Sequence, residues 1–198
     1  VNEARARLGL APCNGVWFWG GGQLADVGLA APFRVHAATG RAADLVRGLV
    51  LSNTAHKIGT TESWNARIAT VEANGIESIA DNVMKLWFTQ AFRSPSNAEF
   101  VGCRAMLVRT PLAGYLGACA ALRDSDLTES TRALKVPALC LVGDQDGSTP
   151  PDLVRSLADL IHGSQFRVIA DAGHIPCVEQ PAAVVALIRQ FLTNARLA

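Results

Sequence analysis

Apolar and polar residues alternate along the last third of the chain in a pattern that predicts strand, helix, strand and helix in turn. Two short apolar runs, Ala138–Val142 and Phe166–Ala170, are typical of buried strands. Between them apolar residues recur at helical spacing and stop at Gly163, and Pro181 opens a second stripe of this kind. Strands separated by helices favour a parallel sheet covered by helices.

The middle of the chain, residues 60–132, shows only helical periodicity. Gly75 suits a helix end, Ser94-Pro95 a break, and Pro111 the start of a helix. The pattern predicts four helices, with apolar faces carried by Trp64–Val71, Ile76–Trp87, Phe100–Met106 and Leu112–Leu122. Because a further apolar run, Gly48–Ser52, reads as a buried strand, these helices lie between two strands and predict an inserted lid.

The first 47 residues combine a predicted short helix, Glu3–Leu8, with a strand, Gly15–Trp19, and a helix from Gln23 to about Ala31. Three glycines separate this strand and helix, and strand, tight turn and helix form the context of a nucleophile elbow. Residues 32–47 are irregular. We therefore expect an α/β fold, with residues 1–59 and 133–198 forming two parts of the core and 60–132 forming the helical lid.

Composition narrows the class of partner. The 198 residues carry 18 basic and 17 acidic side chains without a basic stripe, which argues against nucleic acid and anionic membranes. No apolar run approaches the roughly 20 residues that span a bilayer, and the first residues do not match a signal peptide. The five cysteines are scattered, which predicts reduced thiols in a cytoplasmic protein, with Cys177 in a buried neighbourhood. The four histidines lack metal-ligand spacing, so we expect no metal site.

Two polar side chains follow the predicted strands of the C-terminal part. Asp146 comes after the first strand and His174 after the second, with one helix between them. Because functional side chains of a parallel sheet gather at the carboxyl ends of its strands, we expect an Asp–His pair in which the histidine is a general base. Taken singly, Asp146 also suits an aspartate of a turn or a helix start, and His174 also suits a loop histidine whose hydrogen bonds are satisfied locally. Asp144 is the rival acid, but Asp146 lies at the more usual distance past the strand.

At this point the chain resembles the α/β-hydrolase fold, and more narrowly the 3-oxoadipate enol-lactone hydrolases of the β-ketoadipate pathway. The resemblance covers about 150 residues from Gly48 to the C-terminus. It implies a partial α/β-hydrolase fold and hydrolytic opening of a lactone in aromatic catabolism, without a cofactor. The motifs that carry it are Ser52-Asn53-Thr54-Ala55, Trp64-Asn65-Ala66-Arg67-Ile68, Leu86-Trp87-Phe88-Thr89, Gly114-Tyr115 and Cys119-Ala120-Ala121-Leu122-Arg123-Asp124.

The resemblance also implies a nucleophilic serine on a Gly-x-Ser-x-Gly turn, and here the chain departs from the family. The best local match, Val16–Gly21, places Phe18 where the serine is expected. A shifted or truncated reading frame, natural degeneration, or another serine such as Ser52 or Ser148 would each account for this. Because the chain begins just before this strand, we expect no counterpart of the loop that supplies the oxyanion donor.

Three lid residues are candidates for substrate binding under the same resemblance. The family's substrate carries a carboxylate, and Arg67 suits bidentate recognition of such a group. Trp87 and Tyr115 would line the pocket. The alternatives are a solvated helix face for Arg67 and ordinary core packing for Trp87.

Two functions follow for the chain. One is a carboxylic-ester hydrolase acting on 3-oxoadipate enol-lactone or a similar small lactone or ester, with other esterases and haloperoxidase-like relatives as alternatives. The other is a non-catalytic remnant or interaction module, which Phe18 favours.

If the family's strand order holds, one side of the Val16–Trp19 strand would be an uncovered apolar edge, so we also expect self-association.

Overall fold

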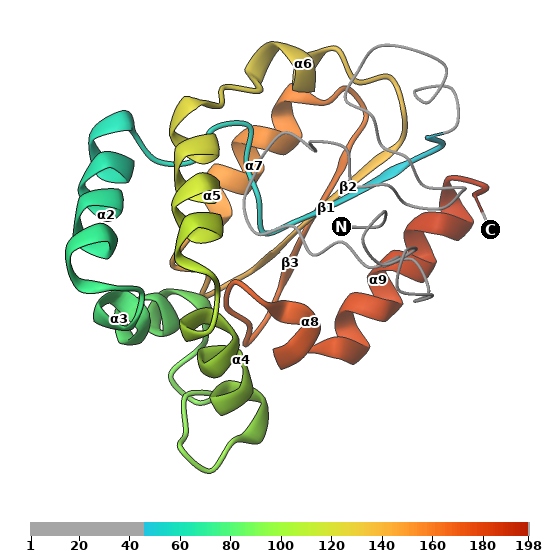
Figure 1. Ribbon diagram of the computed structural model, residues 1–198. Coiled ribbons are helices and arrows are strands. Elements are labelled where there is room, and N and C mark those ends of the chain that lie inside the picture. Colours follow the sequence, from blue (N-terminus) through green and yellow to red (C-terminus); the bar gives the residue numbers. More distant parts are fainter. Residues whose placement is uncertain (1–45, 198) are drawn as a thin grey trace, which may run out of the picture.

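The computed structural model describes residues 46–197. Their elements are β1 (Leu49–Ser52), α2 (Thr61–Asn74), α3 (Glu77–Trp87), α4 (Ala98–Val108), α5 (Leu112–Asp124), α6 (Thr128–Arg132), β2 (Ala138–Gly143), α7 (Pro151–Leu160), β3 (Gln165–Ile169), α8 (Pro176–Glu179) and α9 (Pro181–Asn194) (Figure 1). The predicted elbow strand, the helices at Glu3–Leu8 and Gln23–Ala31, and most of the irregular segment lie outside the described residues.

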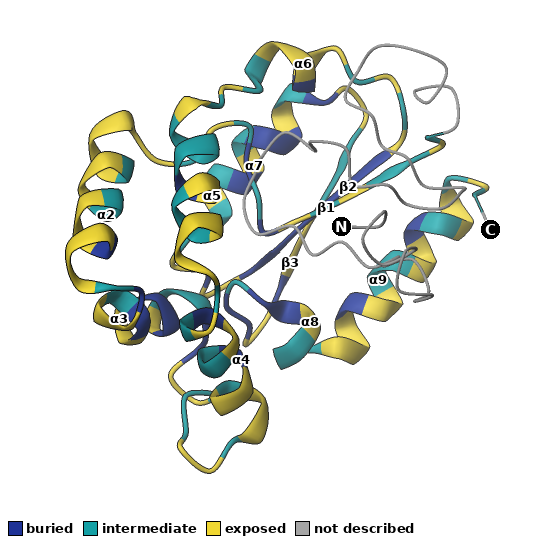
Figure 2. Cartoon of the chain, in the orientation of Figure 1, coloured by how far each residue is buried: buried dark blue, intermediate teal, exposed yellow. Residues whose placement is uncertain are grey.

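The three strands form a parallel sheet in the order β1-β2-β3. Every residue of the central strand β2 is buried, as expected of a parallel strand that is covered on both faces (Figure 2). Alternate side chains of β2 point to opposite faces. Cys140 and Val142 pack with Val154 and Leu157 of α7. On the other face Leu139 and Leu141 pack with Val184 and Phe191 of α9, a cluster that also includes Ile169 of β3 and Ala172 of the following loop.

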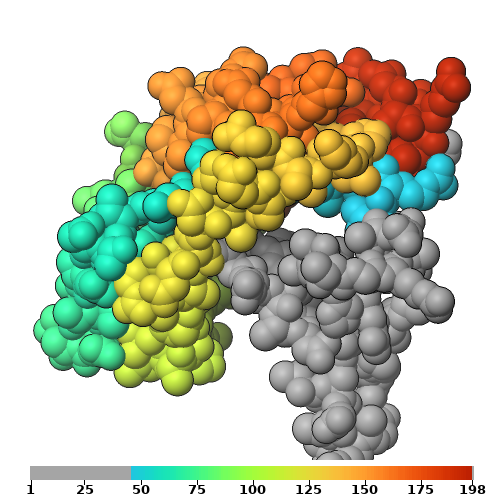
Figure 3. All heavy atoms as spheres, turned by 90° about the horizontal axis from the view of Figure 1, so that it is seen from above, coloured from blue at the N-terminus to red at the C-terminus, as the bar shows by residue number. Residues whose placement is uncertain are grey.

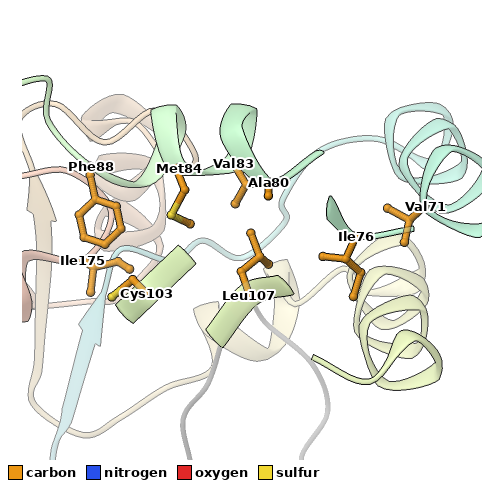
Figure 4. Packing of buried hydrophobic residues seen from close by; sticks show 9 residues of the cluster. All are labelled: Val71, Ile76, Ala80, Val83, Met84, Phe88, Cys103, Leu107 and Ile175. Atoms are coloured by element: carbon orange, nitrogen blue, oxygen red, sulfur yellow. The ribbon is translucent and has the colours of Figure 1, made fainter. Parts of the chain in front are cut away.

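The helices α2 to α6 form the insertion between β1 and β2, at one end of the sheet (Figure 1). Helices α2 and α5 lie side by side, as the view from above also shows (Figure 3). The insertion has its own apolar core, built mainly from α3 and α4 (Figure 4). Ile175, from the segment after β3, belongs to the same cluster and joins the lid to the core of the fold.

The predicted fold class is confirmed, and the helix boundaries follow local chemistry. Helix α2 begins with a capping box between Thr60 and Ser63 and ends at Gly75, whose φ of 75° suits glycine. Helices α6 and α8 were not predicted, because five and four residues are too few to show a helical period. Among the described residues no single helix is long and apolar enough to cross a membrane, although the pair α4 and α5, bent by 90°, passes that test by length and composition alone.

Candidate active site

Asp146 and His174 lie at the carboxyl ends of adjacent strands, and their side chains meet. Asp146 follows β2 and His174 follows β3. Nδ1 of His174 is 2.9 Å from Oδ2 and 3.1 Å from Oδ1 of Asp146. The carboxylate is fully buried, whereas 13% of the His174 side chain is exposed. The expected proximity of these two side chains is therefore found.

The Asp146 carboxylate accepts hydrogen bonds from every side. Oδ1 accepts from the backbone N–H groups of Ser148 at 2.8 Å and Thr149 at 2.9 Å. Oδ2 accepts from Oγ1 of Thr149 at 2.7 Å and from Nδ2 of Asn53 at 2.9 Å. Burial by itself raises the pKa of Asp146, but the hydrogen bonds from His174, Thr149 and Asn53 and the charge interaction with His174 outweigh it and leave the pKa below its usual value. The group is therefore an anion at neutral pH.

The ionised carboxylate fixes the tautomer of the neutral histidine. Because Asp146 can only accept, Nδ1 of His174 carries the proton and Nε2 keeps its lone pair. Nε2 has no hydrogen-bond partner among the described residues, and His174 lines a cavity beneath the lid. The Trp87 ring stacks beside the imidazole, with centroids 6.3 Å apart and planes 24° from parallel. This arrangement can accept a proton from a hydroxyl group or a water molecule placed in the cavity.

The rival acid, Asp144, lies outside this arrangement. Its side chain is exposed, and Oδ1 accepts from the backbone N–H of Ala172 at 3.1 Å. Asp144 therefore ties the loop after β2 to the loop after β3, and Asp146 is the acid that contacts the histidine.

The loop that carries His174 is held at Gly173 from two sides. Its N–H donates to Oε2 of Glu179 at 2.6 Å, and its carbonyl accepts from Nδ2 of Asn53 at 3.2 Å. Oε1 of Glu179 accepts from the backbone N–H and the hydroxyl of Thr89, at 3.0 and 2.8 Å. A side chain at Gly173 would overlap the carbonyl oxygen of Trp87. Glu179 thus connects the end of the lid helix α3 with the histidine loop.

Helix α3 also contacts the loop after β2 and the loop after β3 through two of its backbone carbonyl groups. The Leu86 carbonyl accepts from the N–H of Gly147 at 3.0 Å, and the Trp87 carbonyl accepts from the N–H of His174 at 2.7 Å. Carbonyl groups in the last turn of a helix have no partner within the helix, so they are available for such contacts. Sequence reasoning did not assign a role to Asn53 or Glu179, because their partners lie 93 and 90 residues away, nor to Thr149, which bonds Asp146 three residues earlier in the chain.

A cavity of about 440 Å³ lies between the lid and the carboxyl ends of the strands. Its polar lining consists of Ser63, Arg67, Thr110, Tyr115, Ser148, Thr149 and His174. The rest is mainly apolar and is supplied by Ile58, Gly59, Trp64, Val83, Leu86, Trp87, Cys103, Met106, Leu107, Gly114, Ala118, Cys119, Leu122 and Gly147. Among the described residues no acidic side chain lines it.

All three candidate binding residues, Arg67, Trp87 and Tyr115, line this cavity together with His174. Nη1 of Arg67 is 3.4 Å from the Tyr115 hydroxyl, and its guanidinium carbon lies 5.6 Å from the centre of the Trp64 ring. No carboxylate of the described chain pairs with Arg67. Burial raises the pKa of Tyr115, although Arg67 acts in the opposite direction. The tyrosine is therefore a neutral hydroxyl beside a fixed positive charge.

The serines considered as substitute nucleophiles are placed differently. Ser52 is exposed, and its hydroxyl donates to Oδ1 of Asn53 at 2.8 Å. Ser148 lines the cavity near His174, without a hydrogen bond between their side chains. Phe18 lies outside the described residues.

Cysteines and acidic residues of the described chain do not assemble a metal site, since no group of three or more His, Cys, Asp or Glu side chains there is placed to hold an ion. Cys103, Cys119 and Cys140 are buried free thiols, and burial raises the pKa of each. The expected burial of Cys177 is wrong. It is exposed, because in the single turn of α8 it is Pro176 that faces inward.

Comparison with known proteins agrees with this geometry. The model of the alpha/beta hydrolase fold family matches residues 33–181, and the chain belongs to this family. Among curated proteins, 3-oxoadipate enol-lactonase 1 of Acinetobacter baylyi is 31% identical over 146 residues, which is 74% of this chain and 54% of the relative. The chain thus spans about half the length of the curated enol-lactonases that it matches.

Solved structures of an enol-lactonase and an esterase also superpose on this chain. The enol-lactonase from Burkholderia xenovorans LB400 superposes with a TM-score of 0.72 at 33% identity, covering 77% of this chain and 58% of that one. A thermophilic esterase from Thermogutta terrifontis superposes with a TM-score of 0.70 at 29% identity, covering 78% and 58%.

Proposed function

We propose that this chain is by ancestry a 3-oxoadipate enol-lactone hydrolase, whose acid–base pair is Asp146 and His174. The observation that carries the proposal is the hydrogen bond of 2.9 Å between these side chains beside a lid-covered cavity. The two curated enol-lactonases at 31% identity support the choice of substrate. In this role Nε2 of His174 takes the proton of the attacking hydroxyl and returns it to the leaving group.

The charge of the cavity suits an anionic lactone. Arg67 is the guanidinium in the lining, no carboxylate of the described chain neutralises it, and the lining contains no acidic side chain in that part of the chain. A substrate carboxylate can therefore pair with Arg67 and accept from the Tyr115 hydroxyl beside it. Trp87 would then lie along the lactone ring next to His174.

We expect hydrolysis by this chain to be impaired, because the best local sequence match to the family's serine turn places Phe18 at the position of the serine. A phenyl ring cannot attack a carbonyl carbon. Loss of a catalytic serine typically lowers turnover about a million-fold and leaves about 10³–10⁴ over water. Among the described residues, His174 keeps its bond to Asp146, and no hydroxyl group is hydrogen-bonded to its Nε2.

The test follows the loss of enol-lactone absorbance with the native chain, with Phe18→Ser, and with Phe18→Ser combined with His174→Ala. We expect negligible turnover by the native chain, a gain with Phe18→Ser, and loss of that gain in the double variant. Native turnover that disappears in His174→Ala would show that hydrolysis is not impaired. No gain with Phe18→Ser would show that residue 18 is not the nucleophile position.

A second candidate is a non-catalytic carboxylate-binding module, which Phe18 favours, because the cavity and its guanidinium do not depend on a serine. This candidate predicts binding of a small dicarboxylate such as adipate without turnover in Phe18→Ser. An esterase with another substrate, as the structural likeness to the Thermogutta terrifontis esterase suggests, would instead hydrolyse a neutral ester in preference to the enol-lactone.

A further inference from the structure

Asn53 lies directly after β1 in a backbone conformation that few residues other than glycine adopt. Its φ is 51°, and its N–H donates to the carbonyl of Leu141 on β2 at 2.8 Å. Asparagine tolerates the left-handed region better than most residues, although at some cost. From this position the carboxamide reaches the loops that follow β2 and β3.

The carboxamide of Asn53 is buried, with 7% of the residue exposed, and all its polar atoms are used. Nδ2 donates to Oδ2 of Asp146 at 2.9 Å and to the carbonyl of Gly173, next to His174, at 3.2 Å. Oδ1 accepts from the Ser52 hydroxyl at 2.8 Å. One NH₂ group therefore bonds both the acid and the backbone of the histidine loop.

The other donors to the carboxylate come from the loop of Asp146 itself. The backbone N–H groups of Ser148 and Thr149 and the Thr149 hydroxyl hold the carboxylate within that loop, and this hydroxyl also lies 3.3 Å from Nδ1 of His174. Asn53 belongs to β1, 93 residues earlier in the chain, and fixes the carboxylate relative to the sheet and to Gly173.

We propose that Asn53 is a positioning residue for the Asp146–His174 pair: its NH₂ group holds the carboxylate at Nδ1 of His174 and thereby keeps Nε2 directed at the cavity. The importance of this pair for hydrolysis rests on the function proposed above. The positioning itself can be measured in the folded chain without any turnover.

The first experiment records the tautomer of His174 by long-range ¹H–¹⁵N NMR at neutral pH. The variant Asn53→Gly keeps the backbone conformation without strain and removes the carboxamide. We expect one tautomer, with the proton on Nδ1, in the native chain, and a mixture of tautomers with a broadened Nδ1–H signal in Asn53→Gly. The matched control is Asp171→Gly, in the same loop as His174. There φ is 54°, and the carboxylate makes no hydrogen bond to the described residues.

We expect the control to keep the native signals. An unchanged Nδ1–H signal in folded Asn53→Gly would overturn the proposal. A native chain with the proton on Nε2 would overturn it as well, and that result needs no variant.

The second experiment distinguishes hydrogen-bond donation from simple packing. Asn53→Asp keeps the shape and the tolerance of positive φ, but it places a second carboxylate against Asp146. Two carboxylates that share a site cannot both ionise easily, so the destabilisation should be largest near pH 7. It should shrink toward about pH 5, where a protonated Asp at position 53 can again donate. A destabilisation by Asn53→Asp that is equal at the two pH values would overturn the proposal.

The two proposals fail separately. Absence of enol-lactone turnover in every variant would count against the proposed function, while the NMR and stability results would still decide the role of Asn53.

Discussion

At the scale of single residues, Asp146 links the stability of the fold to pH. Burial raises its pKa, but the hydrogen bonds from His174, Thr149 and Asn53 lower the pKa by more than burial raises it. The net pKa therefore lies below the usual value. A group whose pKa is lower in the folded state contributes stability above its unfolded pKa, about 3.9 for aspartate, and this is lost as the pH falls through the folded value.

We therefore expect Asp146→Asn to lower the free energy of unfolding by about 2–4 kcal/mol near pH 7, because several buried donors lose their charged acceptor. The difference from the native chain should shrink as the pH falls below the unfolded pKa of about 3.9 and through the lower folded value, where the native carboxylate becomes protonated as well. Urea unfolding between pH 3 and 7 measures this. Asp159→Asn, at an exposed position of α7, should stay within about 0.5 kcal/mol at every pH. A difference for Asp146→Asn that does not vary with pH would contradict the linkage.

Arg67 sets the affinity of the cavity for anions. A charge-assisted contact with a carboxylate contributes about 1.5–3 kcal/mol, so Arg67→Gln should weaken the binding of adipate about 10- to 100-fold. Isothermal titration calorimetry measures the change. Arg109→Gln removes an equal charge from an exposed position outside the lining and should leave the affinity nearly unchanged. Equal losses for both variants would indicate a general effect of net charge.

At the scale of elements, the end of β2 approaches the histidine loop so closely that only glycine fits. A Cβ at Gly143 would overlap the carbonyl oxygens of Ala172 and Gly173, which are backbone atoms and cannot move independently. In contrast, nothing lies within 4 Å of a Cβ added at Gly117, on α5.

We expect Gly143→Ala to destabilise the fold by several kcal/mol and to displace the loop that carries His174. Gly117→Ala should instead stabilise it by about 0.5–1 kcal/mol, because alanine favours the helix. Thermal and urea unfolding of both variants make the comparison. A Gly143→Ala protein as stable as the native chain would show that β2 and the histidine loop are not in contact.

The Glu179 side chain connects the end of the lid helix α3 with the histidine loop. Its carboxylate accepts from both Thr89 and Gly173, so Glu179→Ala leaves partly buried donors without an acceptor. We expect a loss of about 2–3 kcal/mol and faster hydrogen exchange at the amides of Thr89 and Gly173. Glu72→Ala, on the exposed face of α2, serves as the control, with an expected change within about 0.5 kcal/mol. Unchanged exchange at both amides in Glu179→Ala would show that Glu179 does not hold the histidine loop to the end of α3.

The elements that the sequence predicted have signals within a few neighbouring residues. Gly75 and Pro111 mark helix boundaries, and the apolar run at Ala138–Val142 marks the central strand. Asn53 and Glu179 could not be assigned a role in this way, because their partners lie 93 and 90 residues away along the chain. The pairing of Asp146 with His174 was predictable, since strand order alone brings the two loops to one edge.

At the scale of the whole described chain, residues 46–197, the helical lid and the sheet with its covering helices have separate apolar cores. One core lies in the lid, and the others lie on the two faces of β2. The cavity is formed where the lid meets the loops after β2 and β3, so the binding residues come from the insertion and the acid–base pair comes from the sheet. The strand pattern indicated the Asp146–His174 pair from the residues themselves, whereas Arg67 and Tyr115 were candidates only through the family resemblance, and the fold places them in the lining with His174.

Self-association belongs to this scale as well, and it stays a prediction based on the sequence. The segment Val16–Trp19 is strongly apolar and reads as a strand, and an uncovered apolar strand edge offers unpaired backbone groups to a second copy. We expect oligomers in size-exclusion chromatography with multi-angle light scattering at tens of micromolar. Phe18→Lys places a charge within the strand and should shift the distribution toward monomer, because charges on edge strands oppose pairing. Val101→Lys adds the same charge at an exposed apolar position of α4 and should leave the distribution unchanged. A sharp native monomer would count against the edge, and an equal response to both lysines would assign the association to net charge.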